Sequence, residues 1–395
     1  MRILFTQHAL AGLRGGTELF TLEVVSELAR RGHEITVYTG KVGKLATHLQ
    51  KIGIMVVDDP RKCPWQPDII HGQHRMHALK GLMAFPTRPG ILYLHGFLPL
   101  LEKPILHPRI HRYVAISKGI ADRWIEGIGI PREKFEIIQN HIDLKRFSTI
   151  REPRRKPEKV LLYSSHRFTP AQLSEMEQAC RHCGMTFDLA GLCAGKEIAI
   201  PEKILPDYDL VFAVGRSAME AAACGCAVIP VFANMADELL STSNYERLLG
   251  QNLSVRVLKH ERLSSSWLIA QIQKWDCESL RCVTERIREE KKLETTVDRL
   301  ESIYRSVLQD AEGRPLPTLD DEIDEIASST LKAYRDLEKE NTKRLELLIP
   351  QAEWMEQRLQ WMSKTLSWRI TAPLRIGMNI INNNNPYQKC LDYLK

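Results

Sequence analysis

The apolar and polar positions of the first 150 residues alternate between short apolar runs and stretches with helical spacing. Residues 2–6 form an apolar run typical of a buried strand, and residues 17–30 place their apolar side chains on one face of a helix. Gly32 ends that helix, and the next strand is predicted at residues 34–38. Strands that alternate with helices in this order predict a parallel sheet with right-handed crossovers.

The same alternation continues along the first domain and returns after a linker. Further strands are predicted at residues 54–57, 68–71, 91–95, 112–116, 159–164, 185–190, 208–214 and 227–231, with helices at 171–183 and from Ser217. Residues 148–158 are rich in proline and charge, lack apolar periodicity and are interpreted as the interdomain linker. The sequence therefore predicts an α/β chain with two Rossmann-like domains, at 1–150 and 157–315, and a helical extension at 316–395.

The C-terminal extension has a different pattern. From residue 320 to 366 the apolar residues recur mostly at three- and four-residue steps, the spacing of a heptad seam. A helical hairpin and a dimerising coiled coil fit this seam equally, and the second would support self-association through residues 320–366. The tail, residues 364–395, has five basic side chains and one acidic one, a net charge of +4. We expect the tail either to lie on an anionic membrane surface or to pack on the rest of the protein.

Composition narrows the class of protein. The chain has 44% hydrophobic and 26% charged residues, as a folded protein does, and it contains no run of 18 apolar residues that would predict a membrane-spanning helix. The N-terminus lacks a secretory signal pattern, so a cytoplasmic location is expected, with the tail as a candidate contact to the inner face of the membrane. The net charge of +6 is spread along the chain, which argues against a dedicated nucleic-acid binder.

Cysteine usage indicates reduced thiols. The nine cysteines are an odd number without a repeating framework, which argues against a set of disulfides. Cys180 and Cys183 form a CxxC, but no second pair completes a four-ligand metal site. We therefore interpret this pair as structural.

The clearest candidate for a ligand site is the segment where the strand at 208–214 runs into Gly215, Arg216 and Ser217. A helix N-terminus offers N–H groups without partners and a partial positive charge, which suit a diphosphate. Gly215 lets a phosphate approach the backbone, Arg216 adds a full charge, and Ser217 is placed to cap the helix. Glu220 has two interpretations: it completes a capping box with Ser217, or it hydrogen-bonds ribose hydroxyls.

Three motifs in order resemble family 4 glycosyltransferases. The run GRSAMEAAACGCAVI, residues 215–229, is similar to the donor-binding segment of that family, and Gly15-Gly16-Thr17-Glu18 is similar to its first loop. Residues 113–118 and 137–147 resemble the phrase that closes the first domain. The resemblance implies the GT-B architecture, with an acceptor-side first domain and a second domain that holds a nucleotide-sugar donor. It also implies hexosyl transfer with retention of anomeric configuration, without a cofactor or metal ion.

The resemblance also assigns roles to residues. Arg167 lies where the family places an arginine that contacts the donor phosphate, and Glu220 would hold the ribose. His95 corresponds to a histidine near the transferred sugar, while Gly15 and Gly16 form the floor of the cleft beneath the donor. Because no dedicated base stands out, the acceptor proton would pass to the donor's own phosphate.

The chain departs from the family pattern at three points. Phe212 occupies the position of a second glutamate near the sugar, and no lysine accompanies Arg167. Only about 50 residues separate Ser165 from Gly215, so the second domain is shortened.

The leading hypothesis is a retaining transferase of surface-polysaccharide or lipopolysaccharide assembly, acting on a glycan or lipid-linked acceptor. Two alternatives stay open. One is a catalytically degenerate GT-B scaffold or binding subunit, and the other is a nucleotide-sugar epimerase, which would act on the donor without an acceptor.

Overall fold

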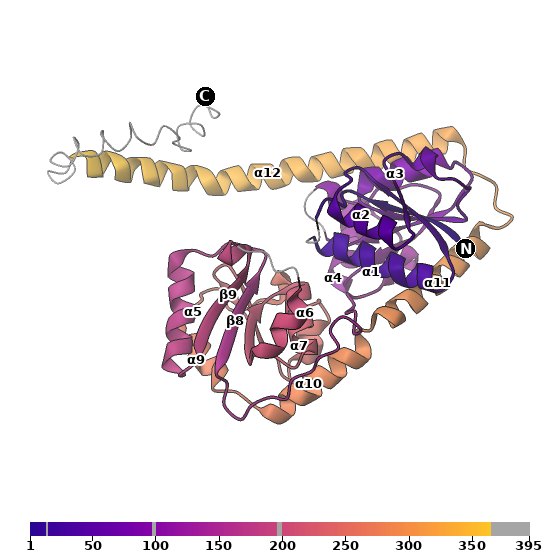
Figure 1. Ribbon diagram of the computed structural model, residues 1–395. Helices are drawn as coiled ribbons and strands as arrows, with labels where there is room; N and C mark the ends of the chain where they lie inside the picture. Colours follow the sequence, from indigo (N-terminus) through magenta and orange to yellow (C-terminus); the bar gives the residue numbers. More distant parts are fainter. Residues whose placement is uncertain (13–14, 97–99, 196–199, 365–395) are drawn as a thin grey trace. The chain divides into compact units, whose positions relative to one another are not determined.

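The computed structural model describes residues 1–12, 15–96, 100–195 and 200–364. Its strands form two sheets, and each sheet has helices packed on both faces (Figure 1). The predicted α/β class with two Rossmann-like domains and a helical C-terminal extension is confirmed.

Within the described residues the first sheet has seven strands, all parallel, in the order β3-β2-β1-β4-β5-β6-β7. They are β1 (Arg2–Gln7), β2 (Glu34–Thr39), β3 (Met55–Val57), β4 (Ile69–Gln73), β5 (Gly90–Leu94), β6 (Ile110–Ala115) and β7 (Phe135–Ile137). Ile3 and Phe5 belong to one apolar cluster and Leu4 to another, because successive side chains of a strand point to opposite faces. Helices α1 (Gly16–Arg30) and α2 (Lys44–Lys51) cover one face, and α3 (Arg75–Ala84) and α4 (Lys118–Ile128) cover the other.

The second sheet has the order β12-β11-β10-β8-β9 and is parallel except for β12. Its strands are β8 (Lys159–Ser164), β9 (Thr186–Gly191), β10 (Leu210–Ala213), β11 (Ala227–Phe232) and β12 (Met235–Ala236). Helices α7 (Gly215–Ala223), α8 (Tyr245–Leu249) and α10 (Cys277–Glu290) pack on one face, and α5 (Pro170–His182) and α9 (Ser265–Ile272) pack on the other.

Short helical turns occupy several connections. They are α6 (Pro201–Ile204) and the 3₁₀ turns η1 (Pro60–Lys62), η2 (Leu100–Glu102), η3 (Arg132–Lys134), η4 (Leu192–Ala194), η5 (Leu205–Asp207) and η6 (Val255–Val257).

Helix α11 (Leu293–Ala311) follows the second sheet in the sequence but packs on the first. Its buried Val297, Leu300 and Tyr304 belong to the same cluster as Phe5 on β1. The Tyr304 hydroxyl lies 2.5 Å from Nδ1 of the buried His71 on β4. The predicted boundary at residue 315 groups α11 with the second domain, and the packing shows that its apolar face contributes to the core of the first.

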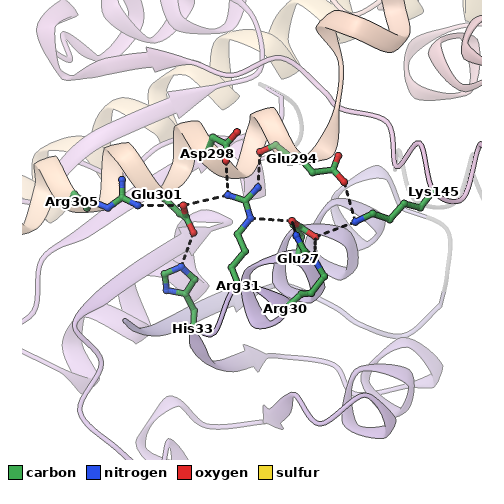
Figure 2. A network of polar contacts seen from close by, with 9 residues as sticks. All are labelled: Glu27, Arg30, Arg31, His33, Lys145, Glu294, Asp298, Glu301 and Arg305. Carbon is green, nitrogen blue, oxygen red and sulfur yellow. Dashed lines mark hydrogen bonds and ion pairs between the residues drawn. The ribbon is translucent and has the colours of Figure 1, made fainter.

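A polar network at the end of α1 reinforces this packing, and Figure 2 shows how it reaches α11. The Arg31 guanidinium lies 2.6 Å from Asp298 Oδ1 and 3.3 Å from Glu301 Oε2, and it donates to the Glu294 carbonyl at 3.1 Å. His33 Nε2 lies 2.8 Å from Glu301 Oε1. The side chains of Arg31 and Glu301 are 18% and 13% exposed, so water screens this pair only partly, whereas Asp298 is 66% exposed and its pair is screened more strongly.

Helix α12 (Leu319–Lys364) is continuous over 46 residues, so the helical hairpin predicted for residues 320–366 is wrong. Self-association through this segment stays a prediction. Residues up to Leu331 belong to the compact unit that contains both sheets, and a second unit begins at Lys332. Within the first unit, Arg109 Nε donates to Glu322 Oε1 at 2.7 Å.

The predicted membrane-binding tail, residues 364–395, lies outside the described residues apart from Lys364. Along the described part of the chain, every helix is too short or too polar to span a bilayer.

The contribution of α11 to the first core can be measured with Leu300→Ala. Leu300 is fully buried, so the truncation leaves a cavity and is expected to lower the free energy of unfolding by about 2–5 kcal/mol in urea denaturation. Leu319→Ala is the matched control, because Leu319 is 69% exposed and its loss is expected to cost less than about 0.5 kcal/mol. Equal costs for the two variants would contradict the packing described for α11.

Candidate functional site

The first turn of α7 lies at the carboxyl end of β10, where the sequence predicts a phosphate site. Gly215 is the first helical residue, has a φ of +61° and donates its N–H to the Leu253 carbonyl at 2.7 Å. The capping residue is Val214, which offers no side-chain acceptor, so the predicted capping role of Ser217 is wrong. Ser217 instead lies within the first turn of the helix. The N–H groups of this turn therefore have no partner inside the helix and no side-chain cap.

Arg216 and Glu220 form an ion pair on this turn, with 2.8 Å between Arg216 Nε and Glu220 Oε1. The capping box proposed for Glu220 is therefore absent. Glu220 is 2% exposed, and burial raises the pKa of its carboxyl, which the Arg216 charge partly offsets. A second carboxylate, that of Glu23 on α1, accepts a hydrogen bond from Arg216 Nη2. The guanidinium is thus held between two carboxylates.

Glu23 is the centre of a wider charge cluster that sequence reasoning missed. Its carboxylate lies 3.0 Å from His141 Nε2 and 3.2 Å from Arg146 Nη1, in addition to Arg216. Burial opposes ionisation of Glu23, but Arg216 and His141 outweigh it and lower the pKa to about 2. Two signals could have pointed to the cluster. Glu23 is an acidic residue among the apolar positions of the 17–30 helix, and His141 and Arg146 lie inside the family-like phrase at 137–147.

His95 follows β5, and its hydrogen bonds fix its tautomer. The Thr21 hydroxyl donates to the Thr17 carbonyl at 2.9 Å, so its oxygen accepts from Gln73 Nε2 at 3.0 Å. Gln73 Oε1 is then the acceptor for His95 Nε2, 2.7 Å away, which puts the proton on Nε2. Burial lowers the pKa of His95, so the ring is neutral near pH 7 and Nδ1 is an acceptor.

The predicted donor-side residues are only partly brought together. The His95 ring lies 4.7 Å from the Phe20 ring, which in turn lies 5.5 Å from the ring of His141, so His95 lies close to the Glu23 cluster. Gly15 precedes α1, and its N–H donates to Glu18 Oε2 at 2.7 Å, so that a Cβ at position 15 would lie 2.8 Å from this oxygen. Gly16 begins the helix. The roles of Gly15 and Gly16 beneath the donor stay predictions.

Arg167 and Phe212 define two further positions. Arg167 is exposed in the loop after β8 and makes no hydrogen bond or ion pair with any described residue. Phe212, at the position of the family's second glutamate, is fully buried in β10. Its side chain packs in the cluster that includes Met176 and Leu268, so it contributes to the core between the second sheet and helices α5 and α9.

The CxxC pair shows no sign of a metal site. Cys180 is buried, Cys183 is partly buried, and both are free thiols. Burial raises the pKa of Cys180 to about 12, so this thiol is protonated at neutral pH. In the part of the chain that the structure describes, no three His, Cys, Asp or Glu residues gather in a way that could hold a metal ion.

The charge cluster predicts a stability loss at low pH. Glu23 is ionised in the folded protein down to about pH 2 and in the unfolded chain down to about pH 4.5, so its contribution is present above pH 4.5 and lost as pH falls toward 2. That loss is expected to be about 3 kcal/mol. Glu23→Gln should lower the free energy of unfolding by about 3 kcal/mol at pH 7 and flatten the acid dependence, measured by urea denaturation at several pH values. Glu285→Gln, on an exposed residue, is the control. The same acid dependence of stability in the unchanged protein and in both variants would contradict the role of Glu23 in the charge cluster.

Comparison with known proteins supports the resemblance and the fold. A sequence model described as Glycosyltransferase Family 4 matches residues 61–146, less than a quarter of the chain. This match includes the motif at 113–118 and nearly all of that at 137–147 but neither Gly15-Gly16 nor the α7 turn. No curated protein matches the sequence.

Solved structures with the same fold cover most of this chain. A glycosyltransferase from Rickettsia africae ESF-5 has 15% identity and a TM-score of 0.57, over 78% of this chain and 99% of that one. Anabaena HepE in complex with UDP-glucose has 16% identity and a TM-score of 0.55, over 78% and 100%. Sucrose-phosphate synthase from Thermosynechococcus elongatus has 12% identity and a TM-score of 0.51, over 78% and 99%. The chain therefore has the GT-B fold of these glycosyltransferases, and its resemblance to family 4 is confirmed over residues 61–146.

Proposed function

We propose that this chain is a glycosyltransferase that moves a hexose from a nucleotide-sugar donor to a hydroxyl of a glycan or lipid-linked acceptor. The observation that carries the proposal is the uncapped first turn of α7, with its buried Arg216–Glu220 pair, near the neutral His95. The GT-B fold and the family 4 segment agree with it, as does the UDP-glucose bound to Anabaena HepE.

The first turn of α7 is the proposed diphosphate site. Its N–H groups lack partners inside the helix, and the helix dipole favours an anion there. Arg216 would exchange its ion pair with Glu23 for a donor phosphate, and the exposed Arg167 would supply a second guanidinium. Glu220 would then hold the ribose hydroxyls from the same turn. In this scheme the phosphates are neutralised by arginines and a helix terminus, and no metal ion is needed.

The proposed reaction retains the anomeric configuration. As the bond from the sugar to the diphosphate breaks, the sugar becomes cation-like and the released phosphate oxygen gains charge. That oxygen is the proposed acceptor of the proton from the attacking hydroxyl. His95 Nδ1 would accept a hydrogen bond from a hydroxyl of the transferred sugar, because Nε2 is committed to Gln73. The place of this activity in surface-polysaccharide or lipopolysaccharide assembly, on the cytoplasmic side of the membrane, is part of the same proposal.

A thermal unfolding series against UDP-, GDP-, dTDP-, CMP- and ADP-sugars tests donor binding. A donor at about 100 times its dissociation constant should stabilise the fold by roughly 2.7 kcal/mol, and one nucleotide class is expected to do so. Glu220→Ala should abolish the shift. Arg167→Ala should weaken it without lowering the melting temperature of the free protein, because Arg167 is exposed. Glu285→Gln should leave the shift unchanged.

Two other results would redirect the proposal. No shift across the whole panel would favour the degenerate scaffold, a reading to which the buried Phe212 also points. Conversion of a donor to its epimer without any acceptor would favour the epimerase.

A further inference from the structure

Three buried polar side chains connect strands β1 and β4 and helix α1 to His95. Gln7 is the last residue of β1, Gln73 is the last residue of β4, and Thr21 lies between them on α1. All three residues are fully buried. A buried amide or hydroxyl without a hydrogen bond costs free energy, so the partners of each group decide how it is oriented. We call Gln7, Thr21 and Gln73 the hydrogen-bond relay.

The backbone fixes the orientation of the Gln7 amide at one end of the relay. The His8 N–H can only donate, and it lies 2.7 Å from Gln7 Oε1, so the amide oxygen must face it. The other end of the amide, Nε2, lies 3.1 Å from Thr21 Oγ1 and donates to it. One lone pair of the Thr21 oxygen is occupied in this way.

The Thr21 hydroxyl is left with a single arrangement. Its oxygen lies 2.9 Å from the Thr17 carbonyl, which can only accept, so the one hydroxyl proton points there. The Gln73 amide, 3.0 Å away, must then donate through Nε2 to the second lone pair. Thr21 thus uses its only proton and both of its lone pairs, which is the full capacity of a hydroxyl.

Gln73 passes the direction set at Thr21 on to His95. With its Nε2 turned toward Thr21, the amide presents Oε1 to His95 Nε2 at 2.7 Å. A flipped amide would set its oxygen against the Thr21 oxygen, whose only proton is committed to Thr17. The backbone of Gln73 is also held, because its N–H donates to Thr6 Oγ1 at 2.9 Å and its carbonyl accepts from the same hydroxyl at 3.0 Å.

The surroundings of His95 leave its ring one proton to place. The ring packs 4.7 Å from the Phe20 ring and 4.8 Å from the Tyr93 ring, between centroids. Burial lowers the pKa of His95 to about 3, so the ring has a single N–H near pH 7. The relay puts this proton on Nε2, which makes Nδ1 an acceptor. A sugar hydroxyl can donate to such a nitrogen, whereas a fluorine or a deoxy carbon in its place cannot.

We propose that Gln7, Thr21 and Gln73 are positioning residues that make His95 Nδ1 an acceptor, and that the site thereby selects a donor sugar with a free hydroxyl facing this nitrogen. The selection rests on the proposed function, in which His95 contacts the transferred sugar. Because the three residues are fully buried, they act through His95 and not by contact with the substrate. The relay is thus a determinant of sugar specificity.

Nitrogen-15 NMR of the histidine rings of the whole protein, without a ligand, tests the positioning role. The two neutral tautomers give different pairs of ring-nitrogen shifts, and the His95 signals are assigned by their loss in His95→Asn. We expect the Nε2–H form in the unchanged protein and in Thr21→Ser, which keeps the hydroxyl. Thr21→Val should bring in the Nδ1–H form, because the Gln73 amide can then turn either way.

Ser26→Ala is the matched control for Thr21→Val. Ser26 lies on the same helix and also donates its hydroxyl to the carbonyl four residues earlier, at 2.6 Å. Its loss should leave the His95 tautomer unchanged. Gln73→Met is the second test, should Thr21→Val fail to fold, because it removes the acceptor of the His95 N–H directly. An Nδ1–H form in the unchanged protein, or an Nε2–H form that survives both relay substitutions, overturns the positioning role.

The selection of the sugar is measured with the nucleotide sugar that stabilises the protein in the donor series and with its deoxyfluoro derivatives, one for each sugar hydroxyl. One derivative should bind the unchanged protein about tenfold more weakly than the parent compound, because fluorine has no proton to donate. That difference should persist in Thr21→Ser and fall below about threefold in Thr21→Val. The selection is overturned if every derivative shows the same difference in the unchanged protein and in Thr21→Val.

The relay and the proposed function fail in separate ways, since the tautomer is measured without a donor. A tautomer that responds to Thr21→Val, in a protein that no nucleotide sugar stabilises, keeps the relay and removes the transferase together with its sugar selection. A nucleotide sugar that stabilises the protein, while the tautomer ignores both relay substitutions, removes the relay and leaves the transferase.

Discussion

The ion pair between Glu23 and Arg216 is the interaction on which the arrangement of the candidate site depends. Glu23 belongs to α1 of the first sheet and Arg216 to α7 of the second, and both side chains are largely buried. Buried charges are stable only with partners, and here one carboxylate serves Arg216, Arg146 and His141 together. Removing the Glu23 carboxylate would take an ion-pair partner from the guanidinium groups of both Arg216 and Arg146. The same contact sets the position of the guanidinium that a donor phosphate would have to capture.

A second set of contacts between early and late parts of the chain involves α11, which follows the second sheet in sequence but packs on the first. Helix α11 packs Leu300 and Tyr304 in the same cluster as Phe5. Arg31 forms ion pairs with Asp298 and Glu301 of α11 (Figure 2). Two polar networks therefore tie later parts of the sequence to α1, one at Glu23 and one at Arg31. Helix α1 carries both, which explains why its inward face is not uniformly apolar.

Sequence patterns predict the strands well, because a buried parallel strand is a short apolar run with clear ends. They miss β7, which is only three residues long and not fully buried. They also place α11 by chain order, since periodicity shows that a helix has an apolar face but not which core receives it. At the site the sequence pattern selects Arg216 and Glu220, which form an ion pair, but it predicts Ser217 as the N-cap of α7, a position that Val214 occupies. Glu23 is missed because a buried charge is recognised by its partners, and these are distant in sequence.

Phe212 is one of the points where this chain departs from the family it resembles, and its burial bears on how that departure can be reversed. Its ring fills space between β10 and the helices α5 and α9. A glutamate introduced there would be an unpaired carboxylate in an apolar core, with a high cost in stability. A single exchange at this position therefore removes packing from the second core without placing a paired carboxylate at the end of β10.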